Sequence, residues 1–135
     1  MTKHCMTFLA LALLALAFNV ASSGPLDDSA KPKLETLMRA ELARVAGTEV
    51  ILSRVTVPPK TSLPKHWHPG EEFAYILEGS ASLWLEGEVQ TTFGPGEVLS
   101  VPLKKVHTAI TGEEGAVILV FRVHESGQPE RVLVE

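Results

Sequence analysis

Short β-rich segments, separated by turn residues, dominate the chain from Glu49 onward. The segments are rich in valine, isoleucine, leucine and aromatic residues, and glycine or proline punctuates the stretches between them. No segment of helical length intervenes after Glu49, so successive strands are expected to pair as antiparallel neighbours. The pattern predicts an all-β sandwich or barrel, with strands over residues 50–52, 55–57, 73–77, 82–85, 89–93, 98–101 and 116–123.

The size and charge of the chain limit its organisation and its partners. The 135 residues leave room for a single domain, which we place at residues 34–135. Hydrophobic residues make up 45% and charged residues 21%, values that are typical of soluble globular proteins and argue against a disordered chain. The net charge is −4 and the basic residues are scattered, which excludes nucleic acid as a partner because its recognition needs a concentrated basic surface.

Residues 1–23 have the pattern of a secretory signal peptide. Lys3 lies near the start, an apolar run covers residues 8–18, and small residues follow up to Ser23. The apolar run is about half of the roughly 20 residues that a membrane-spanning helix needs, so a permanent anchor is the weaker alternative. We therefore expect cleavage near Ser23, a secreted or periplasmic protein, and no membrane anchor after cleavage. Cys5, the only cysteine, leaves with the peptide.

The segment before the first β-rich stretch divides into two parts. Residues 24–33 are polar and contain two prolines, which indicates a flexible leader. Apolar residues then recur at helical spacing, which predicts a short amphipathic helix over residues 34–45, with a strand as the alternative. The apolar positions are Leu34, Leu37, Met38, Leu42 and Val45.

Histidines and one glutamate suggest a metal site. His66 and His68 occupy alternate positions, so in a strand they lie on one face. Glu72 follows across a Pro-Gly turn and can return toward both imidazoles, and His107 is the candidate for a fourth donor. Nitrogen donors with one carboxylate suit a single divalent manganese, iron, nickel, copper or zinc ion better than calcium or magnesium. The structural alternatives are a solvated histidine pair, a surface glutamate and a core histidine.

Two motifs around these residues resemble those of the cupin superfamily. The first consists of residues 66–72, followed by six residues and Gly79, and the second consists of Gly96, five residues, Pro102 and then His107. The resemblance covers about residues 49–124, and the 16 residues between Gly79 and Gly96 are typical of compact, single-domain bacterial members.

The resemblance implies a fold and a ligand set. The fold is the cupin-type double-stranded β-helix, a jelly-roll barrel of six to eight strands, and the ligands of one metal ion are His66, His68, Glu72 and His107. The chain departs from the motifs at Lys60 and Lys104, where glycine is usual, and at Thr111, where asparagine is usual. Because none of these positions supplies a ligand, we expect altered turns and an intact metal site.

Strand alternation predicts the surroundings of the metal. If Glu72 faces inward, Ala74 and Ile76 do so as well, whereas Phe73, Tyr75 and Leu77 face outward. The same count from His107 places Ala109 and Thr111 inside. This lining is small and apolar, and alternation places no further acid or base beside the metal. Arg122 is the one charged residue that can reach the cavity to hold an anionic substrate, but the favoured interpretation is a surface position.

Two functional hypotheses remain. The first is an exported, metal-dependent oxidoreductase of the dioxygenase type that acts on a small organic molecule, with the metal carrying the chemistry. The alternative is a non-catalytic module that captures a small ligand or the metal itself. We also expect a homodimer, with residues 117–120 as an edge or a central strand. Residues 132–134 either close the barrel or cross to a partner.

Overall fold

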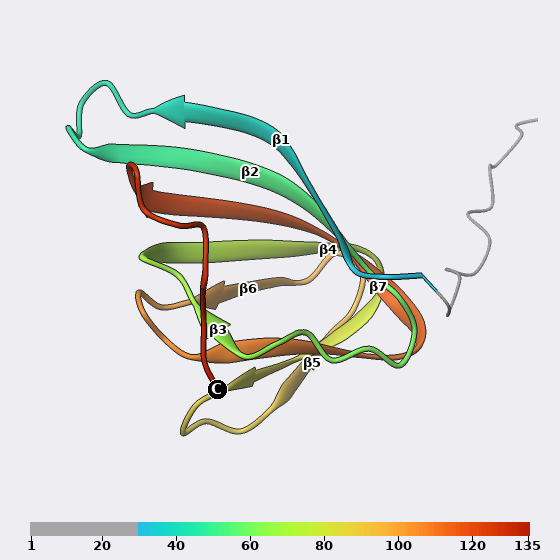
Figure 1. The fold of residues 1–135 in the computed structure, drawn as a ribbon. Coiled ribbons are helices and arrows are strands. Elements are labelled where there is room, and N and C mark those ends of the chain that lie inside the picture. The colour runs from blue at the N-terminus through green and yellow to red at the C-terminus, as the bar shows by residue number, and fades with distance from the viewer. Residues whose placement is uncertain (1–29) are drawn as a thin grey trace, which may run out of the picture.

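The computed structural model describes residues 30–135, which form one curled antiparallel sheet of eight strands (Figure 1). The predicted all-β class is confirmed. The described residues contain no helix, and hence none that is long and apolar enough to cross a membrane. The signal peptide and cleavage site predicted from the sequence, and most of the predicted leader, lie outside the described residues. The strands are β1 (Lys33–Glu41), β2 (Thr48–Val57), β3 (His66–Trp67), β4 (Gly70–Leu85), β5 (Thr91–Phe93), β6 (Val98–Val101), β7 (His107–Glu125) and β8 (Val132–Leu133).

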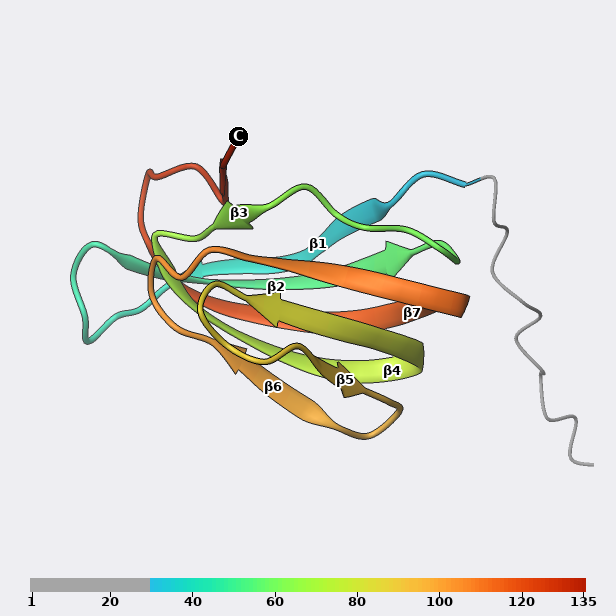
Figure 2. The same ribbon diagram turned by 90° about the horizontal axis from the view of Figure 1, so that it is seen from below.

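The two longest strands, β4 and β7, form the framework of the sheet. They pair antiparallel along almost their whole length, from Gly70 opposite His124 to Leu85 opposite His107. The first half of β4 also pairs with β6, and its second half pairs with β5. On the other side, β7 pairs with β2 and then with β3. Figure 2 shows how this arrangement curls the strands around a common interior.

A pair of glycines permits the bend in the middle of this framework. The β4–β7 register shifts on either side of Gly79. Gly79 and Gly115 both adopt left-handed backbone conformations, with φ of 67° and 70°. A Cβ atom at Gly79 would lie only 2.1 Å from the carbonyl oxygen of Gly115. The two strands therefore approach and bend at a point where a side chain does not fit.

The interior follows the expected alternation. Along the first half of β4, residues from Gly70 to Ile76 are alternately buried and exposed. Phe73, Tyr75 and Leu77 retain 39–46% of their exposure, which confirms that they face outward. The core contains Val55, Val57, Ala74, Ile76, Ala81, Ala116, Ile118 and Val120.

The helix expected at residues 34–45 is wrong, because residues 33–41 form strand β1. This strand pairs with β2 from Lys33 opposite Thr56 to Glu41 opposite Glu49. The register shifts between Thr36 and Met38, which leaves Leu37 without a partner in a β-bulge. The bulge interrupts the two-residue period, and this interruption produced the apparent helical spacing. Hydrogen bonding to the edge of β2 outweighed local helix propensity.

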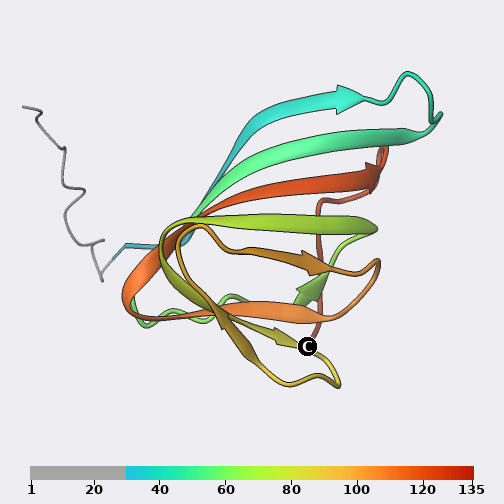
Figure 3. The same cartoon turned by 180° about the vertical axis from the view of Figure 1, so that it is seen from behind.

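The strand pairing answers two questions that the sequence left open, namely the places of residues 117–120 and of residues 132–134. Residues 117–120 lie in β7 between β2 and β4, so they form a central strand. Strand β8 pairs with β3 of the same chain, with Leu133 opposite His66. The C-terminal segment thus closes the barrel beside the histidines, and Figure 3 shows it crossing the end of the sheet below β1 and β2.

The two lysines at glycine positions of the motifs occupy turns with positive φ. Lys60 has a φ of 51° and Lys104 a φ of 57°. Lys104 is the third residue of a tight turn closed by the hydrogen bond from Lys105 N to Pro102 O. The left-handed region is unfavourable for a residue with a Cβ atom, which explains why a glycine suits each position.

Lys104→Gly is expected to raise the free energy of unfolding by about 0.5–1 kcal/mol, because glycine relieves the strain at positive φ. Lys105→Gly is the matched control, since Lys105 has no positive φ. The control is expected to lower stability by about 0.5–1 kcal/mol through the greater entropy of the unfolded chain. Urea denaturation measures both changes, and a loss of stability in both variants would contradict the assignment.

Candidate metal centre

Three buried histidines meet inside the curled sheet. His66 on β3 is the cross-strand partner of His107 on β7, and His68 follows in the turn before β4. Each has a nitrogen within 4.8 Å of the corresponding nitrogens of the other two, and the ring centroids are 4.3–5.1 Å apart. All three side chains are at most 6% exposed. This group is positioned to hold a metal ion.

Hydrogen bonds to backbone carbonyls set the tautomer of all three rings. A carbonyl oxygen can only accept, so each Nδ1 must carry a proton and donate it, which leaves the lone pair on Nε2. In His68 this Nε2 is buried without a hydrogen-bond partner, as expected for a nitrogen reserved for a metal. The acceptors are Pro64 O for His66 at 2.8 Å, Lys105 O for His107 at 2.9 Å, and Glu130 O for His68.

The Glu72 carboxylate lies beside the same nitrogens. Its Oε2 is 3.0 Å from Nε2 of His68, and its Oε1 is 3.9 Å from Nε2 of His107. Arg122 donates from Nε to Oε2 of Glu72 at 2.8 Å. The structure therefore brings all four expected ligands together, and Arg122 fixes the orientation of the carboxylate. This donor set fits a divalent transition metal.

The surroundings of His66, His107 and Glu72 lower the pKa of all three side chains. Burial lowers the pKa of His66 to about 4 and also lowers the pKa of His107. Burial raises the pKa of Glu72, but the His68 ring and the Arg122 guanidinium lower it more strongly, to about 2. Protons therefore compete weakly for these ligand atoms.

The surface position favoured for Arg122 is wrong. Arg122 is only 4% exposed and lies directly opposite Glu72 in the β4–β7 ladder. Cross-strand partners share a face of the sheet, so an inward Glu72 requires an inward Arg122. The residues before Arg122 in this strand are apolar at every position from 116 to 121, so no alternation in the sequence marks its inward face.

A series of paired charges continues from Arg122 and was not identified from the sequence. Arg39 on β1 contacts Oε1 of Glu49 and Oε1 of Glu130, each at 2.5 Å. The other oxygen of Glu130 lies 3.9 Å from Nη1 of Arg122. His124, which is fully buried, has its Nδ1 3.6 Å from Glu49. Charges of alternating sign thus link the candidate metal site to the edge strand. No local sequence signal places residues 39 and 130 together.

A cavity of about 570 Å³ opens onto the histidines. Glu72, Arg122 and Glu130 line it together with all three histidines. Ala74 and Ala109 lie on its wall as expected, whereas Ile76 and Thr111 are buried elsewhere. The Thr111 hydroxyl instead donates to Pro58 O at 2.5 Å. Most of the remaining wall is apolar, and it includes Val55, Leu63, Leu83, Leu99, Ile118 and Val120.

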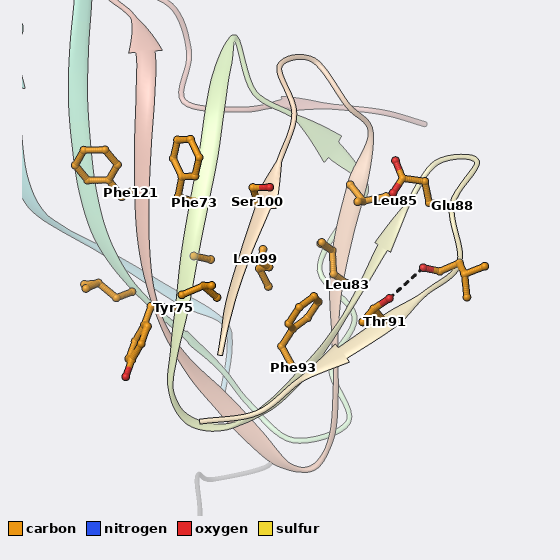
Figure 4. Close-up of a pocket in the computed structure, with 14 residues that line it drawn as sticks. Phe73, Tyr75, Leu83, Leu85, Glu88, Thr91, Phe93, Leu99, Ser100 and Phe121 are labelled. Carbon is orange, nitrogen blue, oxygen red and sulfur yellow. Dashed lines mark hydrogen bonds between the residues drawn. The ribbon is translucent and has the colours of Figure 1, made fainter. Parts of the chain in front are cut away.

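A second hollow, of about 720 Å³, contains no histidine and is lined by outward residues such as Phe73 and Phe121 together with Leu83 and Leu99, which also line the first cavity (Figure 4). Phe73 and Phe121 stand side by side on neighbouring strands at one end, and Phe93 and Leu83 lie toward the other. Phe73 and Tyr75, which face outward as expected, contribute exposed apolar surface to this hollow. The homodimer itself stays a prediction.

The C-terminal segment is expected to contribute to metal affinity through its backbone. Truncation after Glu125 removes the carbonyl that orients His68 and the strand that pairs with β3. We expect an affinity loss of roughly 10–100-fold. Glu130→Ala keeps the carbonyl and should lose less. Competition with a chelator measures both affinities, and equal affinity in a folded truncated protein would contradict the prediction.

The metal-free protein is expected to lose stability on acidification. The pKa of His66 is about 4 in the folded protein and 6.5 in the unfolded chain, so the unfolded state binds more protons between these values. Stability therefore falls as pH drops from about 6.5 to 4, and the lowered pKa of Glu72 extends the loss below 4.5. Urea denaturation at several pH values measures the slope. His66→Asn should flatten the slope above pH 4.5, and an unchanged slope would contradict the assignment.

Comparisons with known proteins agree with this geometry. The model of the Cupin domain family matches residues 53–122, which is just over half of the chain. A comparison with curated protein sequences gave no match.

Solved structures with the same fold include enzymes. The polyketide cyclase RemF from Streptomyces resistomycificus is 27% identical, with a TM-score of 0.60 over 78% of this chain and 73% of that one. The DMSP lyase DddQ from Ruegeria pomeroyi is 28% identical, with a TM-score of 0.58 over 63% of this chain. The match covers only 43% of the lyase chain.

The fold expected from the cupin resemblance is confirmed. A cupin family protein with a double-stranded β-helix fold from Methanocaldococcus jannaschii superimposes with a TM-score of 0.59 at 18% identity, over 73% of this chain and 86% of that one. With the family model matching more than half of its residues, this chain belongs to the Cupin domain family.

Proposed function

We propose that this cupin is a metal-dependent enzyme that acts on a small organic molecule. His66, His68, Glu72 and His107 are its metal ligands in this proposal. The observation that carries it is the set of three histidines with fixed tautomers, whose free nitrogens and a neighbouring carboxylate open onto a cavity of about 570 Å³. A cavity of this size accommodates a small ligand.

The residues of the chain have distinct tasks in this proposal. A bound metal supplies Lewis acidity and, where it is iron, manganese or copper, redox chemistry. The carbonyls of Pro64, Lys105 and Glu130 hold the imidazole rings in place. Arg122 orients Glu72, and the apolar wall excludes water from the substrate.

The lining favours a reaction in which the metal carries the chemistry. Apart from the proposed ligands, Glu130 is the one carboxylate among the described residues that line the cavity, and Arg39 pairs with it. This scarcity of free acids and bases supports dioxygenase-type oxidation of a small enolic or aromatic compound.

The similarity to a lyase and a polyketide cyclase, each above 25% identity, favours a second candidate. In that candidate the metal acts only as a Lewis acid, and the reaction is an elimination or a cyclisation. The third candidate is a non-catalytic module that captures a small ligand or the metal itself.

Secretion through a cleaved signal peptide and assembly into a homodimer remain part of the proposal.

One experiment separates the three candidates. The metal-free protein is loaded with iron, manganese, copper or zinc, the metal content is measured, and oxygen uptake and product formation are followed with catechols, flavonoids, enols, oxalate and DMSP. Oxygen uptake with a redox-active metal but not with zinc is expected. Turnover with zinc and without oxygen uptake would support elimination or cyclisation instead, and tight metal binding without any turnover would support the module.

His66→Ala is the site variant for this assay. It is expected to lose metal and turnover together, while circular dichroism reports an intact fold. Ser82→Ala, which changes an exposed hydroxyl outside the cavity, is the control and should behave as the unmodified protein. Full metal content in the folded His66 variant would contradict the ligand assignment.

A further inference from the structure

Basic residues predominate among the charged groups that line the metal-site cavity, although the whole chain carries a net charge of −4. The lining contains Lys31, Lys33, Arg122 and Arg131, but only two carboxylates, those of Glu72 and Glu130. Lys31 and Arg131 are exposed, so they lie at the opening of the cavity, whereas Arg122 is buried. The local charge is thus opposite to that of the protein as a whole.

Ion pairs neutralise both carboxylates and one of the lysines. Glu72 pairs with Arg122 at 2.8 Å, and Glu130 pairs with Arg39, which does not line the cavity, at 2.5 Å. Lys33 pairs with Glu35 at 2.9 Å. Across residues 30–135, Lys31 and Arg131 have no ion-pair partner. Within the described part of the chain, two positive charges at the opening therefore lack a carboxylate partner.

Deeper in the cavity, Arg122 has an unused donor. Its Nε is bonded to Glu72, but its buried Nη1 has no hydrogen-bond partner. Oε2 of Glu130 is 3.9 Å from this nitrogen, which is too far for a hydrogen bond. A buried guanidinium nitrogen without an acceptor is unfavourable, and an oxygen of a bound ligand would satisfy it.

The rest of the wall is made of aliphatic side chains, among them Leu63, Leu83, Leu99 and Val120. Such a surface binds hydrocarbon and does not favour a fully hydrated ion. A ligand that suits the whole cavity combines a short apolar part with a single anionic group.

We propose that this cavity binds a short-chain organic carboxylate, which Lys31 and Arg131 attract at the opening and Arg122 anchors in the interior. The inference rests on the proposed function for its site and adds the class of substrate. Lys31 and Arg131 lie outside residues 53–122, so the segments that flank the family domain provide the charge selectivity. Positive charge around an apolar pocket concentrates anions there.

The test compares two probes that differ in charge but hardly in shape, pentanoate and pentanamide. Their binding to residues 24–135 is measured by calorimetry, both without metal and with zinc. Pentanoate is expected to bind at least about tenfold more tightly than pentanamide, and its affinity should fall with added salt. Equal binding of the two probes, in both forms of the protein, would overturn the proposal.

Variants show which residues recognise the charge. Lys31→Gln/Arg131→Gln is expected to lower pentanoate affinity about fivefold and to leave zinc content unchanged, since the substitutions keep the backbone and no side-chain hydrogen bond or ion pair joins either residue to a histidine. Arg44→Gln/Lys60→Gln is the control, because it removes the same charge from exposed residues that do not line the cavity. An equal loss in both double variants would overturn the role of the cavity opening.

Arg122→Lys tests the interior anchor, since it keeps the positive charge but removes the planar group that carries Nη1. Pentanoate affinity in the metal-free protein is expected to fall several-fold, with pentanamide unaffected. The proposal would be overturned if the protein preferred pentanoate only when it is loaded with zinc and if no variant changed this preference. The metal alone would then recognise the carboxylate. Carboxylate preference in a protein that binds no metal would instead contradict the proposed function and leave this inference standing.

Discussion

The long antiparallel pairing of β4 with β7 is the constraint on which the rest of the structure depends. It places Glu72 opposite Arg122 and brings His107 to the end of the ladder, where β3 adds His66 beside it. A shift of one residue would turn each of these side chains to the opposite face of the sheet. The bend at Gly79 and Gly115 lets the same two strands form both halves of the curled sheet. The metal site is thus a property of strand register as much as of residue type.

Paired charges extend this constraint to segments beyond the family domain. Each charge in the series of Glu72, Arg122, Glu130, Arg39 and Glu49 neighbours one of opposite sign. This pairing compensates the burial of Glu72, Arg122 and Glu49, whereas Arg39 is exposed and Glu130 is half-buried. The C-terminal segment enters the series through the carboxylate of Glu130 and reaches the site again through its carbonyl. A metal ion at the three histidines would add a positive charge next to Glu72, the first residue of this series. Binding of a metal ion there would therefore be coupled to docking of the C-terminal segment through direct contacts.

The family domain and the segments that flank it contribute different residues to the cavity. Residues 53–122, which the Cupin domain family model matches, contain all four proposed ligands and most of the apolar wall. The flanks add the residues at the opening of the cavity. Within one fold, the chemistry that the metal supplies can stay the same while the flanks change which ligand enters. The similarity to both a lyase and a cyclase is consistent with a scaffold that accommodates different reactions.

The sequence by itself determined the β class, because two-residue alternation is a local property, and the spacing of two cupin-like motifs grouped His66, His68, Glu72 and His107. Two of the interruptions between predicted strands, at residues 78–79 and 112–115, lie inside the long strands β4 and β7. The sequence also indicated that Phe73 and Tyr75 face outward. It was wrong on β1, where a bulge at Leu37 imitated helical spacing and pairing with β2 overrode local propensity. It was wrong on Arg122 as well, whose burial depends on the cross-strand partner that faces it. Only the tertiary structure decided the roles of Arg39 and Glu130, since residues 91 positions apart meet only when β1 and the C-terminal segment fold onto the same end of the sheet.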